Sequence, residues 1–239
     1  MKGKTDLHEQ HFRGKRIGEV ILGFQDGLVN VLGVVLGVAV ATNNILIILV
    51  AGFATTFAET ISMGAVAYTS KKAERDYYES ERALEEKEVE ETPEEEIKEI
   101  RGIYAKKGFK GKLLNDVVKV ITSNKKVWID TMMSEELNLS PRFDKSPLSS
   151  GVTVFFATLV GSLMPILPFV LFSITNAMIA SVIISSLVLF IVGAIKARLT
   201  IGNWVLSGIE LSIIGILAAL ISYLIGFGLG QAFGTNIAV

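Results

Sequence analysis

The chain has 239 residues, of which 50% are hydrophobic and only 20% are charged, and its mean hydropathy is +0.50. This composition is too apolar for an ordinary soluble domain and predicts an all-α integral membrane protein. Cysteine is absent from the sequence, which excludes disulfides and thiolate metal sites, so any soft metal ligand must be methionine. We expect no nucleic-acid partner.

Five apolar stretches are long enough to cross the roughly 30 Å of hydrocarbon in a bilayer, which takes about twenty helical residues. The short polar segments "TNN" and "SITN" separate the first stretch from the second and the third from the fourth, so both pairs are predicted to be helical hairpins. The five stretches are approximately 17–41, 44–70, 149–172, 177–196 and 203–229.

The distribution of Lys and Arg predicts the orientation. Of the 23 such residues, sixteen lie in 71–147, five precede the first span, and two lie between the last two spans. Because basic loops stay in the cytosol, we expect the N-terminus and residues 71–147 to be cytosolic and the C-terminus to lie outside. No cleavable signal is recognisable. The expected segments are 1–16 (cytosolic), 17–70 (spans one and two), 71–147 (cytosolic domain), 148–230 (spans three to five) and 231–239 (external tail).

The charged segment is itself expected to be helical. Residues 71–91 contain neither Gly nor Pro, so the second span should continue as a helix into water. Thr92 then caps a second helix, and Glu95 would complete a capping box. With two further helices at about 112–122 and 125–137, the segment is predicted to be a small helical bundle.

Seven side chains in this bundle are candidate metal ligands. The glutamates form two pairs, each three residues apart on one helix face, and an antiparallel packing of the two helices brings four carboxylates together. Carboxylates alone suit Mg²⁺, Ca²⁺ or Mn²⁺, whereas added thioethers favour Fe²⁺, Co²⁺ or Zn²⁺. The alternatives are a solvated acidic face and methionines that fill a core. The candidates are Glu85, Glu88, Glu96, Glu99, Met132, Met133 and Glu136.

Three acidic residues, Asp26, Glu59 and Glu210, lie away from the ends of the predicted spans, where a charge costs several kcal/mol and therefore indicates function. Asp26 shares a helix face with Asn30, Gly33 and Gly37, and this stripe fits a close helix contact and a polar path. Glu59 precedes Met63 by one turn, which again combines a carboxylate with a thioether. The alternatives are an Asp26 hydrogen bond to a neighbouring helix end and simple packing of Met63.

Other features are less specific. Glu210, in "SGIELSII", fits function and structure equally well. Pro165 and Pro168 should kink the third span and free backbone carbonyl groups. His8 and His11 have a spacing that can bind metal, although they lie in a polar terminal segment.

The sequence contains, in this order, the motifs "GFQDGLVNVLGVVLGV", "ETISMGAVAYTS", "EEEIKEIRGIYAKKG", "WIDTMMSEELNL", "MPILPF" and "SGIELSIIGILAALISYL". Together these six motifs resemble the vacuolar iron transporter family, over about residues 8–230. Members of this family move Fe²⁺, and sometimes Mn²⁺, out of the cytosol in exchange for protons. The resemblance implies a dimer of five-helix chains with a glutamate-rich metal-binding domain between helices two and three. It places the family's cytosolic ligands on the seven residues above and its translocation residues on Asp26 and Met63.

One position departs from the family pattern. The family's second-helix glutamate, eight residues before the methionine, corresponds here to Thr55, whereas this chain has Glu59 four residues before Met63. One helical turn keeps the same face, so Glu59 is a candidate replacement at a shifted depth. A change of proton coupling or of metal preference is the other interpretation.

We therefore expect a homodimeric proton/Fe²⁺ antiporter that is not an enzyme and holds no permanently bound cofactor, with divalent transition metals, protons and the lipid bilayer as partners. It would reside in the plasma membrane of a prokaryote or the vacuolar membrane of a eukaryote. A membrane-tethered metal buffer or sensor is the alternative. A di-iron ferroxidase would need Glu-x-x-His pairs, and no histidine follows residue 11.

Overall fold

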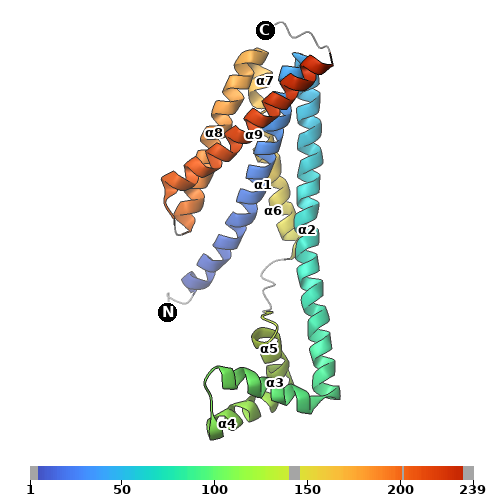
Figure 1. Ribbon diagram of the computed structural model, residues 1–239, viewed down its shortest axis with the longest axis vertical. Coiled ribbons are helices and arrows are strands. Elements are labelled where there is room, and N and C mark those ends of the chain that lie inside the picture. The colour runs from blue at the N-terminus through green and yellow to red at the C-terminus, as the bar shows by residue number, and fades with distance from the viewer. Residues whose placement is uncertain (1–4, 140–145, 201, 234–239) are drawn as a thin grey trace. The chain divides into compact units, whose positions relative to one another are not determined.

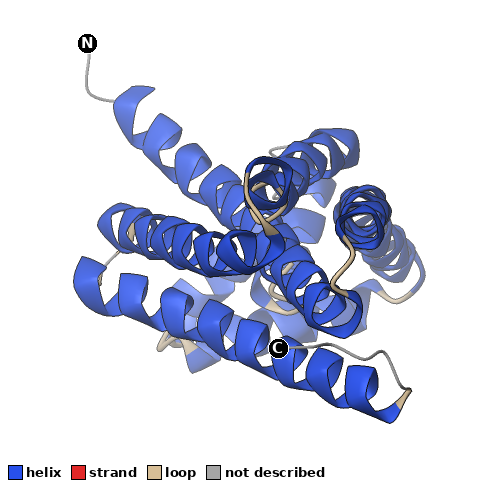
Figure 2. Cartoon of the chain, turned by 90° about the horizontal axis from the view of Figure 1, so that it is seen from above, coloured by secondary structure: helices blue, strands red, loops and turns tan. Residues whose placement is uncertain are grey.

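The computed structural model describes residues 5–139, 146–200 and 202–233, with side chains from Ile17 onward in the first helix (Figure 1). Helices make up all the regular secondary structure in these ranges (Figure 2). In chain order they are α1 (Thr5–Thr42), α2 (Ile45–Glu91), α3 (Pro93–Lys106), α4 (Gly111–Thr122), α5 (Lys125–Glu135), α6 (Pro147–Leu163), α7 (Leu167–Leu171), α8 (Ile174–Leu199) and α9 (Trp204–Ala232).

Four helices in the described part of the chain are long and apolar enough to cross a membrane. They are α1 from Ile17 onward, α2, α8 and α9. These helices coincide with four of the five stretches predicted from hydropathy. The continuation of the second span into the charged segment is also confirmed, because α2 extends without interruption to Glu91.

The third predicted span, 149–172, is not one continuous helix. It consists of α6 and the five-residue α7, which are separated by a turn. A 17-residue helix is about 25 Å long, which is less than the hydrocarbon thickness. The break coincides with Pro165 and Pro168, which have no N–H to donate within a helix. Ser181 of α8 donates a hydrogen bond to the carbonyl oxygen of Pro165. A side chain of a neighbouring helix therefore satisfies a backbone carbonyl group at the break.

The chain divides into two compact units. Residues 70–139 belong to one unit, and the remaining described residues belong to the other. In the larger unit, α1 packs against α6, α8 and α9. Figure 1 shows α1 lying between α6 and α9. Helix α1 is therefore the central helix of the apolar unit.

Small residues allow α1 to approach two different neighbours. A Cβ added at Gly23 would lie 2.8 Å from Oγ1 of Thr158 on α6, and one at Gly33 would lie 2.7 Å from Oγ of Ser222 on α9. The close helix contact predicted for the small residues of the stripe formed by Asp26, Asn30, Gly33 and Gly37 is therefore present. Gly33 and Gly37 are covered by α9, because a Cβ at Gly37 would also contact the backbone of Ser222.

The smaller unit consists of the end of α2 with α3, α4 and α5. Its core contains apolar side chains from all four helices, including Ile100 and Trp128. Arg82 on α2 forms an ion pair of 2.7 Å with Asp130 on α5. Further ion pairs join Lys125 to Glu90 and Lys107 to Glu135. These contacts fix α5 against α2 and α3, and thereby position the side chains described below.

The helices α5 and α3 of this unit begin differently. Asn124 caps α5 in the expected manner, because its side chain accepts hydrogen bonds from the backbone N–H groups of Lys126 and Val127. Thr92 is the N-cap residue of α3 but makes no capping hydrogen bond. Its hydroxyl group instead donates to the carbonyl oxygen of Glu88, at 3.1 Å. The predicted capping box is therefore wrong, and Thr92 closes the end of α2 instead.

Candidate metal sites

Three carboxylates meet where α2 ends and α3 begins. Glu85 and Glu88 come from α2 and Glu96 comes from α3, and one ligand oxygen from each lies within 4.8 Å of those of the other two. Glu85 and Glu96 are each only 5% exposed. The Oε2 atoms of both side chains are buried and have no hydrogen-bond partner. Such an arrangement is costly unless a cation or protons neutralise it.

The electrostatics of this cluster favour the binding of a cation. Burial raises the pKa of Glu85 and of Glu96 from the ordinary value of 4.5 to about 7. The neighbouring charges that add to this effect on the pKa of both groups all belong to carboxylates. Because a bound divalent cation would reverse the effect, the cluster is suited to exchange protons for metal near neutral pH.

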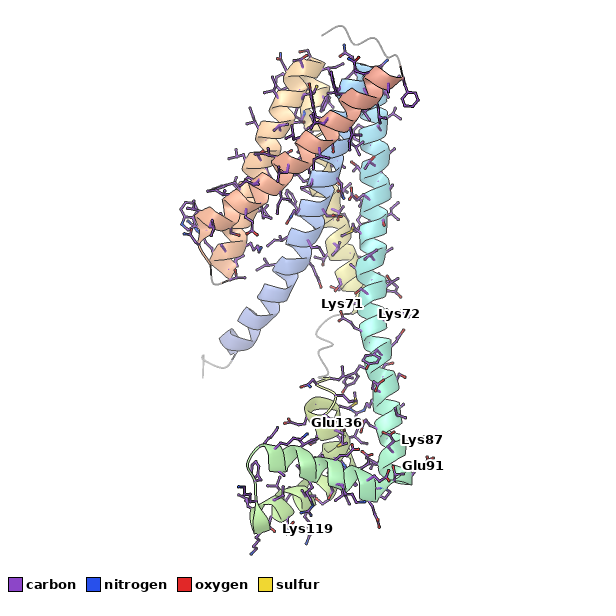
Figure 3. All side chains as sticks on the ribbon, in the orientation of Figure 1. Lys71, Lys72, Lys87, Glu91, Lys119 and Glu136 are labelled. Atoms are coloured by element: carbon purple, nitrogen blue, oxygen red, sulfur yellow. The ribbon has the colours of Figure 1, made fainter. Side chains whose placement is uncertain are left out.

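The remaining two predicted carboxylates lie close to this cluster. Burial, and then the negative charge of Glu99, raises the pKa of Glu136. Glu136 and Glu99 both contribute to the raised pKa of Glu85. Figure 3 labels Glu136 at the end of α5, in the same unit as the cluster. All five glutamates predicted from helical spacing are therefore electrostatically coupled.

The two methionines are placed differently from the carboxylates. Met132 and Met133 are both 0% exposed and lie in the apolar core of the small unit with Ile100 and Ile129. Their complete burial agrees with the alternative that these methionines fill the core. A role as thioether ligands stays a prediction.

A second polar group lies within the spanning helices. Asn30 of α1 donates a hydrogen bond to Oε1 of Glu59 on α2. Glu59 also interacts electrostatically with the carboxyl group of Asp26, which is half-buried. Oε2 of Glu59 is buried and has no partner, so this group has capacity for a further ligand.

The other predicted membrane residues fall into two classes. Met63 lies one turn after Glu59 on α2, and Thr55 lies one turn before Glu59. Both side chains are half-buried. Glu210 is exposed on α9, unlike Asp26 and Glu59. The side chains of His8 and His11 lie outside the described residues.

Spacing alone did not identify the partner of Glu59. Asn30 was recognised only as part of a stripe on α1. A signal in α2 could have pointed to this site. Glu59, Thr60 and Met63 follow Thr56 by three, four and seven residues, so all four side chains lie on one helix face.

These features define a polytopic integral membrane protein with one acidic cluster in its charged unit and a carboxyl pair within its apolar helices. The chain matches the VIT family over residues 17–227. It is 36% identical over 217 residues to "Vacuolar iron transporter 1" of Tulipa gesneriana, which covers 90% of this chain and 88% of that protein. It is 34% identical over 230 residues to "Vacuolar iron transporter 1" of Oryza sativa subsp. japonica (95% and 90% covered) and 34% identical over 213 residues to that of Arabidopsis thaliana (88% and 85% covered). The chain belongs to the VIT family.

Proposed function

We propose that this protein moves Fe²⁺, and other divalent transition metals of similar chemistry, across a membrane in exchange for protons. The observation that carries this proposal is the pairing of Glu59 with both Asp26 and Asn30 between two apolar helices. Ionisable groups at membrane depth are costly and mark ion pathways. The names of the relatives above, which are iron transporters, support the choice of metal.

The proton coupling follows from competition at the carboxyl groups. A carboxylate must lose its proton before it binds a metal ion, so metal entry at Asp26 and Glu59 would displace protons from these carboxyl groups. Loss of the metal on the other side allows the pair to take up a proton again. Met63, one turn from Glu59, would supply a thioether that favours Fe²⁺ over Mg²⁺ or Ca²⁺.

The acidic cluster of Glu85, Glu88 and Glu96 would collect the metal before transport. We infer that Glu99 and Glu136 complete the ligand set and that Met132 and Met133 border it. The raised pKa values of Glu85 and Glu96 support this role, because protons and metal then compete near the pH of the cytosol.

The distribution of basic residues supports a topology with five membrane crossings. Helices α6 and α7 together would form the third crossing, and residues 71–147 and the N-terminus would face the cytosol. Transport would then lead out of the cytosol, across the plasma membrane of a prokaryote or the vacuolar membrane of a eukaryote.

A second copy of the chain would cover the polar face of α1. The Asn30 side chain is exposed although it lies in a spanning helix. An exposed amide is poorly accommodated by lipid, so a dimer contact along this face would bring two Asp26–Glu59 pairs to one path.

Uptake of Fe²⁺ into proteoliposomes with an imposed proton gradient tests the proposal. Wild-type protein should accumulate iron and move protons in the opposite direction, and Asp26→Asn should do neither. A membrane-tethered metal buffer is the second candidate, because the acidic cluster lies in a unit of its own. Iron binding by the purified protein without any flux would favour the buffer and refute transport.

A further inference from the structure

An apolar cavity of about 370 Å³ lies between α2 and α6, within the larger unit. It is open at the surface, because large side chains that line it are exposed, among them Leu148 at 66% and Phe156 at 58%. Its volume falls in the range of about 300–1,000 Å³ that is typical of small-molecule sites. The lining residues include Ile61, Ala65 and Tyr68 of α2 and Leu148, Val152 and Phe156 of α6.

Two glycines that line the cavity bring the backbones of α2 and α6 together. A Cβ added at Gly151 of α6 would lie 2.9 Å from the carbonyl oxygen of Gly64 and 3.1 Å from Cβ of Tyr68. A Cβ added at Gly64 of α2 would lie 3.1 Å from Cβ of Phe155. These contacts fix the spacing of the two helices, so the cavity is a preformed feature of the larger unit.

The cavity lies at the end of the apolar part of both helices. Leu148 is the second residue of α6, which begins after the N-cap residue Ser146. Tyr68 precedes the charged part of α2, which begins at Lys71. Tyrosine is common at the boundary between membrane and water, because its ring is apolar and its hydroxyl group forms hydrogen bonds. The cavity therefore lies at the level where lipid acyl chains meet their headgroups.

Polar groups suited to a headgroup follow on the same helix. Figure 3 labels Lys71 and Lys72 on α2. Lys71 forms an ion pair of 2.7 Å with Glu74, whereas Lys72 has no ion pair with any residue that the structure describes. Lys72 lies one helical turn after Tyr68, so the two side chains share a helix face. An ammonium group at the membrane surface attracts anionic lipids.

We propose that this cavity binds one acyl chain of an anionic phospholipid, with the headgroup at the turn of α2 that carries Tyr68 and Lys72. A phospholipid is apolar along its chains and charged at its head, which matches an apolar cavity that ends at a hydroxyl group and a cation. A flat apolar face contacts lipid without selecting it, whereas a concave site buries most of its ligand. This lipid site goes beyond the proposed antiport and does not depend on it.

The test uses the purified, full-length protein in detergent. Phosphatidylglycerol is the anionic probe, and phosphatidylcholine with the same acyl chains is the comparison without net charge. Native mass spectrometry measures the lipid bound per chain, and the thermal midpoint reports its effect on stability. Ala65→Phe fills the cavity with an aromatic ring. Ala58→Phe, at an exposed position two turns earlier on α2, is the matched control.

We expect saturating phosphatidylglycerol to raise the wild-type midpoint by about 5 °C or more. Wild-type protein should bind this lipid about fivefold more tightly than phosphatidylcholine, because one unpaired lysine lies at the headgroup. Ala65→Phe should lose both the bound lipid and the rise in midpoint, whereas Ala58→Phe should keep both. Lys72→Gln should bind the two lipids about equally.

Three results would overturn the lipid site. The first is undiminished lipid binding in Ala65→Phe, and the second is equal binding of the two lipids by wild type. The third is an equal rise in midpoint with short-chain phosphatidylglycerol, which would show that the headgroup alone is recognised. If Ala65→Phe does not fold, Lys72→Gln decides, because an unchanged preference for phosphatidylglycerol would also contradict the proposal.

A second copy of the chain is the competing occupant of this face. Light scattering of wild type and Ala65→Phe measures the mass of the assembly. A smaller assembly in Ala65→Phe, with the same amount of bound lipid as wild type, would assign the cavity to a contact between protomers and overturn the lipid site. An unchanged assembly that has lost its lipid would support it.

Discussion

Asn30 on α1 donates its side-chain amide to Glu59 on α2, across 29 residues of sequence. This contact orients Oε1 of Glu59 and leaves Oε2 buried and unpartnered. It also explains how a glutamate one turn away from the position occupied in the resembled family can still face Asp26. An amide donor stabilises a carboxyl group in an apolar setting without adding a charge.

Removing the charge of Glu59 should uncouple protons from metal. Glu59→Gln retains an oxygen that accepts from Asn30, so the fold is expected to persist, but the side chain can neither release a proton nor bind a cation by charge. We expect proton flux driven by an iron gradient to fall to the level of empty vesicles. Glu210→Gln, at an exposed carboxylate in another spanning helix, is the control and should behave like wild type. Normal coupling in Glu59→Gln would rule out this residue as a proton carrier.

The acidic cluster should set affinity and not the ability to transport. Glu85→Gln and Glu96→Gln each remove one buried ligand from the group within 4.8 Å. We expect each to weaken Fe²⁺ binding by about tenfold, equivalent to ~1.4 kcal/mol, with slower transport at low iron and near-normal transport at saturating iron. Glu95→Gln, exposed on the same turn of α3, is the matched control. Complete loss of transport at saturating iron would contradict a collecting role.

The stability of the small unit should fall as the pH rises. Glu85 and Glu96 have pKa values of about 7 in the folded protein, against an ordinary value of 4.5. The folded state therefore binds more protons than the unfolded state between these values, and the stability that protonation provides is present below pH 4.5 and lost as the pH passes through 7. Hydrogen exchange of α3 backbone amides should accelerate from pH 5 to pH 8, after correction for intrinsic exchange.

Two additions to that measurement test the cause. Saturating Fe²⁺ under anaerobic conditions should restore protection at pH 8, because the cation replaces the protons. Glu85→Gln combined with Glu96→Gln should flatten the pH dependence. A profile that keeps its slope in the double variant would assign the effect to other groups.

Close packing of α1 and α6 should depend on Gly161. A Cβ at this position would overlap the backbone of Phe24, which cannot move away as a flexible side chain can. We expect Gly161→Ala to destabilise the protein by about 1–3 kcal/mol, as overpacking usually does, and to lower the thermal midpoint in detergent. At Gly228 on α9 an added Cβ has no described atom within 4 Å, so Gly228→Ala should leave the midpoint almost unchanged. Equal midpoints for both variants would show that the two helices separate easily.

The sequence alone determined the elements that depend on local pattern. Hydropathy identified four of the five predicted spans among the described helices, because a helix in lipid must be apolar along its whole length. Helical spacing singled out Glu85, Glu88, Glu96, Glu99 and Glu136, because residues three or four apart share a face. The break at Pro165 and Pro168 was also predictable, since proline lacks the N–H that a helix requires.

Only the tertiary structure decided which helix each face meets. Periodicity placed Asn30 and Gly33 on one stripe of α1, but packing turned Asn30 toward Glu59 and Gly33 toward Ser222. The spacing of Met132 equally fitted a ligand and a core residue, and the structure buries it completely. Local sequence fixes the direction of a side chain relative to its own helix axis, whereas its surroundings depend on the positions of the neighbouring helices, which are set by side-chain packing between segments far apart in the chain.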